Sequence, residues 1–375
     1  MTELNLDQIP AANGKGRLTP VAILTGFLGS GKTTLLNQLL RDPTMVRTAV
    51  VINEFGDISI DHALTADSND SILVLENGCL CCTVFGDLLQ TLNRLYHSRA
   101  DGSIAFDRVA IETSGLADLP TIIQAFLSDP TLRGLYRVNT MIATVDAVNG
   151  PSTLAEHSVA VRQIALADHI LITKLDLISD DNRQATRESL RRHLRRINRT
   201  AMIHDVGDAL SMDPAQLIRH PGLDPTHSPQ AAKIWVELGQ TEDADHEEGH
   251  THIHDSSISS FSLVRDAPIP REALNLLLAC LESQLGPSLL RVKGLVHVAE
   301  EPDRPAIIQG AQHLLHNLTW LRQWPDADRR TRIVFITQGI ASAELRETVQ
   351  LLDRVAQRTA AARQRAAEHA EGPDR

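Results

Sequence analysis

Residues 26–33 have the sequence GFLGSGKT, which matches the phosphate-binding pattern G-x-x-x-x-G-K-[ST] at every fixed position. The apolar run VAILTG, from Val21, precedes this loop and predicts a β-strand, and the following TTLLNQLLRD has leucines at helical spacing. In a loop between a strand and a helix, backbone N–H groups can surround phosphate oxygens, and the helix adds its positive end. The sequence therefore predicts a nucleoside triphosphate site rather than an empty glycine-rich turn.

The side chains of this loop have separate expected roles. Lys32 is a predicted catalytic residue, because its ammonium would neutralise the β- and γ-phosphates, and the Thr33 hydroxyl would ligate Mg²⁺. The other residues of the loop that we expect to hold the nucleotide are Gly26, Gly29, Ser30, Gly31 and Thr34.

Five further apolar runs predict strands, with helical stretches between most of them. These runs are TAVVINEFG, SILVLENG, DRVAIETSG, NTMIATVDAV and HILITKLDL. Near-continuous Val, Ile and Leu strands that alternate with helices are typical of a parallel sheet covered on both faces. The predicted fold class is therefore α/β: the parallel sheet of a P-loop NTPase with helices on both faces, plus a small C-terminal α+β domain.

The composition changes after about residue 200, and a new pattern begins at Ile258. SISSFSLV, LLRVKGLVHVA, PAIIQGA and TRIVFITQ are predicted strands, and REALNLLLACLESQL and SAELRETVQLLDRV are predicted helices. We therefore expect a flexible tail at 1–18, a P-loop domain at 19–203, a linker with a His-rich segment at 204–257, a C-terminal domain at 258–357 and a tail at 358–375.

The residues Thr173-Lys174-Leu175-Asp176 follow the sixth strand and have the form [N/T]-K-x-D. The Asp176 carboxylate can accept from the N1–H and the 2-amino group of guanine, whereas adenine offers neither donor. The aliphatic stem of Lys174 can cover the base plane. Thr173 stands where asparagine is more usual, so we expect a weaker local brace. The motif favours GTP over ATP, although a strand followed by a charged turn is the commonplace alternative.

Glu112 and Gly115 end the fourth strand, in the sequence IETSG. We expect Glu112 to be the second catalytic residue, holding Mg²⁺ through water or orienting the attacking water, and Gly115 to let backbone approach the γ-phosphate. The alternative is an ordinary surface carboxylate at a strand end.

Three of the four cysteines lie within ENGCLCCT, residues 76–83, as Cys79, Cys81 and Cys82. Thiolates select Zn²⁺ and related transition ions over Mg²⁺ and Ca²⁺. Three thiols alone do not close a tetrahedral site, and an incomplete site suits a carrier. Inert buried thiols and a redox pair are the alternatives. Cys280, within LNLLLACLESQL, is expected to be a packed core residue instead.

Two further segments offer metal ligands. In NEFGD, between the P-loop and the cysteines, we expect Glu54 or Asp57 to contact Mg²⁺ or the thiolate-bound metal when nucleotide orders the loop. The histidines of the acidic DHEEGHTHIHD can hold Zn²⁺, Co²⁺ or Ni²⁺ loosely, and a polar linker without such a duty is the alternative. The histidines predicted as ligands are His250, His252 and His254.

Together GFLGSGKTTLLN, INEFGD, ENGCLCC, ETSGLAD and TKLD resemble the CobW-type P-loop GTPases in order and spacing. The resemblance is strong over residues 20–180 and continues into the C-terminal domain. It implies a low-turnover GTPase that acts as a metallochaperone, with GTP, Mg²⁺ and Zn²⁺ or Co²⁺, and that delivers the metal to a client protein. Zinc supply is favoured; the alternatives are cobalt delivery for cobalamin synthesis and activation of a metalloenzyme such as nitrile hydratase.

The composition limits the other classes of function. A formal net charge of −11 argues against nucleic acid as the main partner, and the N-terminus has no signal-peptide pattern. No apolar run approaches a membrane span, so a cytoplasmic protein is expected. A homodimer is compatible with the sequence, which does not decide the oligomeric state. A small-molecule kinase and a metal-buffering protein are the rivals from other classes.

Overall fold

The computed structural model describes residues 18–53, 73–76, 84–207, 217–218, 258–284, 288–311, 314–315, 318–325 and 327–340, with Glu347 and Arg354. Several predicted metal ligands lie outside these residues: Glu54, Asp57, Cys79, Cys81, Cys82, His250, His252 and His254. Most of the helix predicted over 342–355 also lies outside them. The chain forms two compact units, one around each of two sheets.

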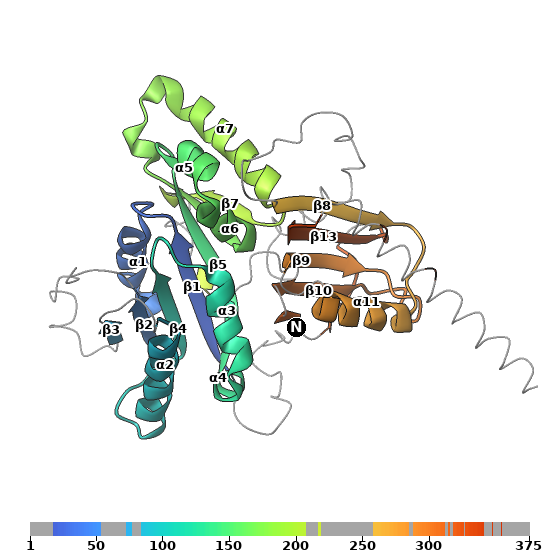
Figure 1. Ribbon diagram of the computed structural model, residues 1–375, viewed down its shortest axis with the longest axis horizontal. Helices are drawn as coiled ribbons and strands as arrows, with labels where there is room; N and C mark the ends of the chain where they lie inside the picture. The colour runs from blue at the N-terminus through green and yellow to red at the C-terminus, as the bar shows by residue number, and fades with distance from the viewer. Residues whose placement is uncertain are drawn as a thin grey trace, which may run out of the picture. The chain divides into compact units, whose positions relative to one another are not determined.

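A parallel sheet of seven strands forms the first unit in the part of the chain that the structure describes, in the order β3-β2-β4-β1-β5-β6-β7 (Figure 1). The strands are β1 (Thr19–Gly26), β2 (Thr48–Asn53), β3 (Leu73–Glu76), β4 (Arg108–Thr113), β5 (Tyr136–Asp146), β6 (His169–Thr173) and β7 (Met202–Asp205). The first six confirm the predicted strands. β7, which pairs with β6 in parallel, is an addition to the prediction.

The helices that follow the first strands are α1 (Lys32–Leu40), α2 (Val84–Ala100), α3 (Leu119–Ser128) and α4 (Pro130–Leu135), and later in the chain come α5 (Gly150–Glu156), α6 (Ser158–Leu166) and α7 (Asp180–Ile197). Short 3₁₀ turns, η2 (Pro43–Met45) and η4 (Leu175–Leu177), follow α1 and β6. The leucines of α1 belong to one buried cluster with Leu24 and Val50. The alternate residues Val21 and Ile23 are also fully buried, so the opposite face is covered too.

The helices α2, α3 and α4 lie together, and α3 and α4 contact β5 (Figure 1). The hydroxyl of Tyr136 at the start of β5 donates to Leu92 O in α2 at 2.7 Å, and burial raises the pKa of this hydroxyl. Both faces of the sheet therefore carry helices, and the predicted fold class is confirmed.

The position of β1 in the sheet determines where a ligand can bind. β1 lies between β4 and β5 and pairs with both in parallel. After β1 the chain forms β2, β3 and β4 on one side of it and then crosses to form β5, β6 and β7 on the other side, so the strand order reverses at β1. In open α/β sheets, ligands bind beyond the carboxyl ends of the strands at such a point. The loop after Gly26 lies at this edge.

The second unit holds an antiparallel sheet in the order β11-β10-β9-β13-β8, with β12 paired to β10. Its elements are β8 (Ile258–Arg265), α11 (Arg271–Gln284), β9 (Leu289–Val296), β10 (Ala306–Ala311), β11 (Leu314–Leu315), β12 (Thr319–Trp320) and β13 (Thr331–Gln338). The four predicted strands and the first predicted helix of this region are confirmed. The two-residue strands β11 and β12 are additions to the prediction.

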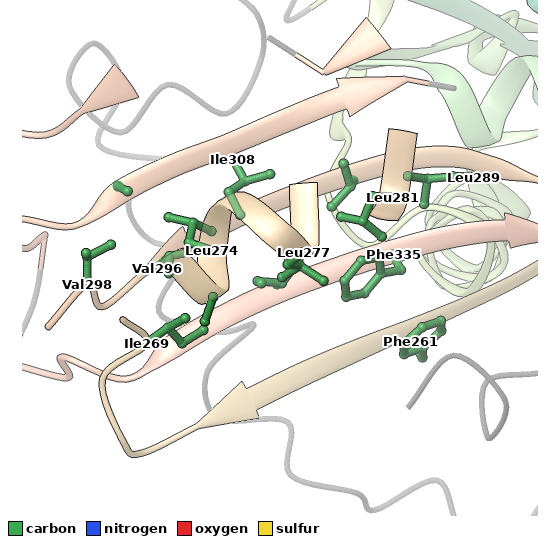
Figure 2. Close-up of a cluster of buried hydrophobic side chains, with 14 residues drawn as sticks. Phe261, Ile269, Leu274, Leu277, Leu281, Leu289, Val296, Val298, Ile308 and Phe335 are labelled. Carbon is green, nitrogen blue, oxygen red and sulfur yellow. The ribbon is translucent and has the colours of Figure 1, made fainter. Parts of the chain in front are cut away.

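The core of this unit lies between α11 and the sheet. Figure 2 shows Leu274, Leu277 and Leu281 of α11 among side chains of the strands, including Ile308 and Phe335. Cys280 of the same helix is a free thiol of intermediate exposure and is not part of the buried cluster. The prediction of a packed core cysteine was therefore wrong, because Cys280 lies beside the apolar stripe of α11 with intermediate exposure.

In the described part of the chain, none of the helices has the length and apolar character needed to cross a membrane.

Candidate nucleotide-binding site

The phosphate-binding loop leaves β1 at Gly26, where the backbone excludes a side chain. Gly26 has φ +140°, and a Cβ added there would lie 2.3 Å from Thr144 Oγ1 and 2.6 Å from Thr144 O on β5. The loop ends at Gly31, which has φ +93° and immediately precedes α1. Only glycine adopts both conformations without strain, so these two positions allow the backbone to turn from the strand into the helix.

Ser30 fixes the loop to the ends of β5 and β6. Its Oγ lies 2.7 Å from Thr144 Oγ1 in a buried hydrogen bond. The Thr173 hydroxyl at the end of β6 donates to Ser30 O at 2.7 Å, with Val145 O as a second acceptor at 3.3 Å. Thr173 therefore supplies a buried brace through its hydroxyl, although asparagine is the more usual residue at this position. The phosphate-binding loop and the TKLD segment are directly joined.

Lys32 lies at the start of α1 with its side chain directed back into the loop. The residue is 4 % exposed, and Nζ donates to Phe27 O at 3.4 Å. A buried ammonium is stable only with compensating polar partners, and a phosphate group is a stronger partner than a carbonyl. Its place inside the loop is the one expected of a cation that meets phosphate.

Glu112 lies near the carboxyl end of β4 and is fully buried, so the alternative of a surface carboxylate was wrong. The Thr33 hydroxyl donates to its Oε1 at 2.5 Å. A hydroxyl and a carboxylate are hard oxygen ligands of the type that Mg²⁺ takes beside nucleotide phosphates. These two side chains fit a Mg²⁺ ion bound next to the phosphate-binding loop.

Gly115 brings the segment after β4 against the phosphate-binding loop. A Cβ at this position would lie 2.6 Å from Leu28 N and 2.7 Å from Leu28 Cδ2. A contact this short with backbone requires the loop to move, so the close approach depends on glycine.

The TKLD segment forms a tight turn after β6. Lys174 has φ 58°, an uncommon conformation for a residue with a side chain, and it precedes η4, which contains the exposed Asp176. Lys174 Nζ contacts Asp146 Oδ2 at 2.6 Å, at the end of β5. Burial raises the pKa of Asp146, but hydrogen bonds from Lys174, Val148 and Asn149 outweigh it, so the net pKa is lowered. Asp146 is therefore an ionised partner for Lys174 at neutral pH.

Most of the residues predicted to bind nucleotide thus come together at one edge of the sheet. They are Gly26, Gly29, Ser30, Gly31, Lys32, Thr33, Thr34, Glu112, Gly115 and Thr173, with Lys174 and Asp176 on the adjoining turn. Sequence reasoning missed Thr144 and Asp146 on β5. Both lie in the last three residues of a strand that was predicted, and a polar residue near the carboxyl end of a central strand was the available signal. Within the described residues, the structure has no cluster of three or more His, Cys, Asp or Glu side chains arranged to hold a metal.

Comparison with known families matches the chain in two places. Residues 20–205 match the model of the CobW/HypB/UreG nucleotide-binding domain. Residues 258–352 match the cobalamin synthesis protein cobW C-terminal domain. The two matches follow each other in the order that the sequence resemblance implied.

Individual relatives agree with the family models over nearly the whole chain. The chain is 33 % identical to the zinc chaperone YjiA of Escherichia coli, across 88 % of this chain and 98 % of YjiA. It is 28 % identical to the zinc chaperone CobW of a Sinorhizobium species, across 84 % and 92 %. The crystal structure of Zn(II)-bound YjiA GTPase from E. coli superposes with a TM-score of 0.60 at 26 % identity, covering 91 % of this chain and 99 % of that one. The resemblance is thereby confirmed, and the chain belongs to the CobW family, with a CobW/HypB/UreG nucleotide-binding domain followed by a CobW C-terminal domain.

Proposed function

We propose that this protein is a GTP-hydrolysing metallochaperone that carries Zn²⁺ and delivers it to a client metalloprotein. The observation that carries the proposal is the contact between Thr33 and Glu112 beside a complete phosphate-binding loop. This pairing equips a member of the CobW family for Mg²⁺-dependent phosphate chemistry.

The residues of the loop would have separate roles in binding and hydrolysing the nucleotide. Backbone N–H groups at residues 29–33 and the N-terminus of α1 would bind the phosphates, and Lys32 would stabilise the negative charge that develops during transfer. Thr33 and Glu112 would hold Mg²⁺, which supplies further charge stabilisation when bound. The burial of Glu112 supports this role, because a carboxylate in such a place needs a cationic or hydrogen-bonding partner.

Recognition of guanine rests on Lys174 and Asp176. Asp176 is exposed in η4, where its carboxylate is open to a base placed at this edge of the sheet. Thr173 ties the turn to the phosphate-binding loop, so the base and the phosphates of one nucleotide would be held by joined segments. Lys174 would cover the base with its aliphatic stem.

The cargo metal would be held by Cys79, Cys81 and Cys82. Three closely spaced thiols suit Zn²⁺, and the names of the relatives, zinc chaperone YjiA and zinc chaperone CobW, favour zinc over cobalt. Glu54 or Asp57 would contact Mg²⁺ or this metal when the nucleotide orders the NEFGD segment, so metal binding would depend on the bound nucleotide. His250, His252 and His254, in the linker 204–257, would serve as a weak metal reservoir.

The proposed partners are GTP and the client metalloprotein, which the C-terminal domain at 258–357 would contact. Free thiolates require a reducing compartment, and this supports work in the cytoplasm. The negative net charge disfavours nucleic acid.

A metal titration tests the proposal. Zn²⁺ and Co²⁺ are titrated into the purified protein against a competing chelator, with Mg²⁺ and either GDP or a non-hydrolysable GTP analogue. We expect tighter Zn²⁺ binding with the GTP analogue and loss of this site in Cys81→Ala. If the Zn²⁺ affinity is the same with GDP and with the GTP analogue, the protein stores metal independently of its GTPase activity. If Co²⁺ binds more tightly than Zn²⁺, the cargo is cobalt.

A further inference from the structure

The turn formed by residues 174–177, here named the base-recognition turn, is held by two side chains that lie outside the TKLD motif. One is Asp146, at the end of β5, and the other is Arg183, in the first turn of α7. We propose that Asp146 and Arg183 are positioning residues that hold this turn in the shape that distinguishes guanine from other purines. The inference rests on the proposed role of Asp176 in guanine recognition and adds the residues that make it selective.

Asp146 holds the first residue of the turn by its side chain. Its carboxylate is itself fixed: Oδ1 accepts from Val148 N at 2.7 Å and from Asn149 N at 3.2 Å, and Oδ2 accepts from Asn149 Nδ2 at 3.1 Å. Lys174 Nζ donates to Oδ2 at 2.6 Å. Because the carboxylate is 9 % exposed, water competes weakly for this ion pair. Lys174 is thus held from a rigid strand end.

The backbone of Lys174 explains why such a hold is needed. Its φ of 58° and ψ of 25° are left-handed, a conformation that is unfavourable for a residue with a side chain. The conformation persists only where neighbouring contacts enforce it. Ala147 N donates to Thr173 O at 2.9 Å on one side, and Lys174 O accepts from Leu177 N at 3.1 Å on the other. The ion pair with Asp146 adds a side-chain contact to these backbone bonds.

Arg183 donates hydrogen bonds to backbone carbonyl groups in the turn and immediately after it. Nε donates to Leu175 O and Nη2 donates to Ile178 O, both at 3.0 Å. Nη1 contacts Asp180 Oδ1 at 2.6 Å, which fixes the guanidinium plane. The two carbonyls flank Asp176 in the sequence. One planar guanidinium group therefore spans residues 175–178, the segment that carries the carboxylate proposed to recognise the base. Lysine lacks the divergent donors required for both bonds.

The consequence concerns selectivity more than total affinity. The phosphates are bound by the loop at residues 26–33, and this contribution is common to all nucleoside diphosphates. The contribution of Asp176 depends on the base: GDP offers N1–H and the 2-amino group, whereas IDP offers only N1–H. A displaced Asp176 therefore weakens GDP more than IDP. Variants of Asp146 and Arg183 should lower the ratio of the two affinities, whereas general damage to the loop would weaken both alike.

The test measures Kd for GDP, IDP and ADP with the full-length protein by calorimetry. The variants are Asp146→Asn and Arg183→Met, with Arg183→Lys as the conservative replacement. Arg187→Met is the matched control, because Arg187 lies one turn further along α7 and pairs with Asp205 at 2.6 Å. Thermal melting without nucleotide accompanies each variant.

We expect Arg183→Met and Asp146→Asn to weaken GDP binding about tenfold, while IDP binding changes less. Arg183→Lys should recover part of the preference, and Arg187→Met should keep all of it. If Asp146→Asn and Arg183→Met both keep the wild-type ratio of GDP affinity to IDP affinity, the inference is wrong. The proposed recognition of guanine by Asp176 would not be affected by that result. Equal binding of ADP and GDP by the wild type would overturn the proposed function and this inference with it. If Arg183→Met does not fold, Arg183→Lys and Asp146→Asn decide between the same outcomes.

Discussion

The hydroxyl of Thr33 and Oε1 of Glu112 are joined by a hydrogen bond of 2.5 Å. This bond connects the first turn of α1 to the end of β4, two elements that are 79 residues apart at these positions. Two oxygen ligands of a bound cation are normally neighbours of this kind, so the pair is close enough to share one ion.

The first prediction is that Glu112→Gln lowers GTP hydrolysis about 100-fold or more, because the neutral amide cannot balance a divalent cation in a buried site. Mg²⁺ should also cease to strengthen nucleotide binding. Single-turnover hydrolysis and GDP binding with and without Mg²⁺ measure both effects. The control is Asp107→Asn, an exposed carboxylate just before β4 that pairs with Arg47. A Glu112→Gln protein that hydrolyses GTP at the wild-type rate would remove Glu112 from the mechanism.

The second prediction concerns base selectivity. Asp176→Asn should weaken GDP binding about tenfold or more and strengthen binding of xanthosine diphosphate. Xanthine has a carbonyl where guanine has the 2-amino group, and an amide can donate to that carbonyl while it accepts from N1–H. Competition binding of the two diphosphates provides the ratio. If the ratio is unchanged, Asp176 does not contact the base.

The third prediction compares a closely packed glycine, Gly115, with an exposed one, Gly134. Gly115→Ala should destabilise the protein by roughly 1–3 kcal/mol, because the new Cβ would meet the backbone of Leu28. Gly134→Ala should instead stabilise it by about 0.5–1 kcal/mol, since Gly134 is exposed near the end of α4 with nothing within 4 Å of the added Cβ. Urea unfolding of the two variants should move in opposite directions. If the two variants are equally stable, Gly115 does not pack closely against the phosphate-binding loop.

The fourth prediction is a pH dependence of stability that arises at His193 in α7. Burial, and then the nearby charge of Arg196, lower the pKa of His193 below its ordinary value. As the pH falls through about 6.5, the unfolded chain binds a proton at this residue more readily than the folded protein does, so the free energy of unfolding decreases. Urea unfolding at pH 8 and pH 5 should show a smaller decrease for His193→Gln than for the wild type. The same decrease in both proteins would exclude His193 as the source.

The central strands were predictable because they are buried on both faces. In β1 and β4 nearly every residue is buried, and the consecutive apolar residues 21–24 and 109–111 form the continuous runs that identify a parallel strand. β7 was missed because its four residues, MIHD, include two polar side chains at the edge of the sheet. An edge strand is less buried, so its sequence carries a weaker signal. β11 and β12 have two residues each, which is too short for a recognisable hydrophobic pattern.

The nucleotide site divides in a similar way. Lys32, Thr33 and Asp176 belong to contiguous motifs, so their roles can be predicted without a structure. The contact of Lys174 with Asp146 cannot be found in this manner, because the two residues are 28 positions apart and meet through the pairing of β5 with β6. The register that aligns Asp146 with Thr173 is a property of the folded sheet, and no local pattern encodes it.

Ser30 is the residue at which the two halves of the nucleotide site meet. Its Oγ is hydrogen-bonded to Thr144 and its carbonyl oxygen accepts from Thr173, so Ser30 links the loop at residues 26–33 to the end of β5 and to the TKLD segment. Neither half can shift without disturbing the other. An exchange of GDP for GTP should therefore leave this framework nearly still, with little loss of chain entropy on binding. Any large rearrangement that accompanies hydrolysis must then arise in other segments of the chain.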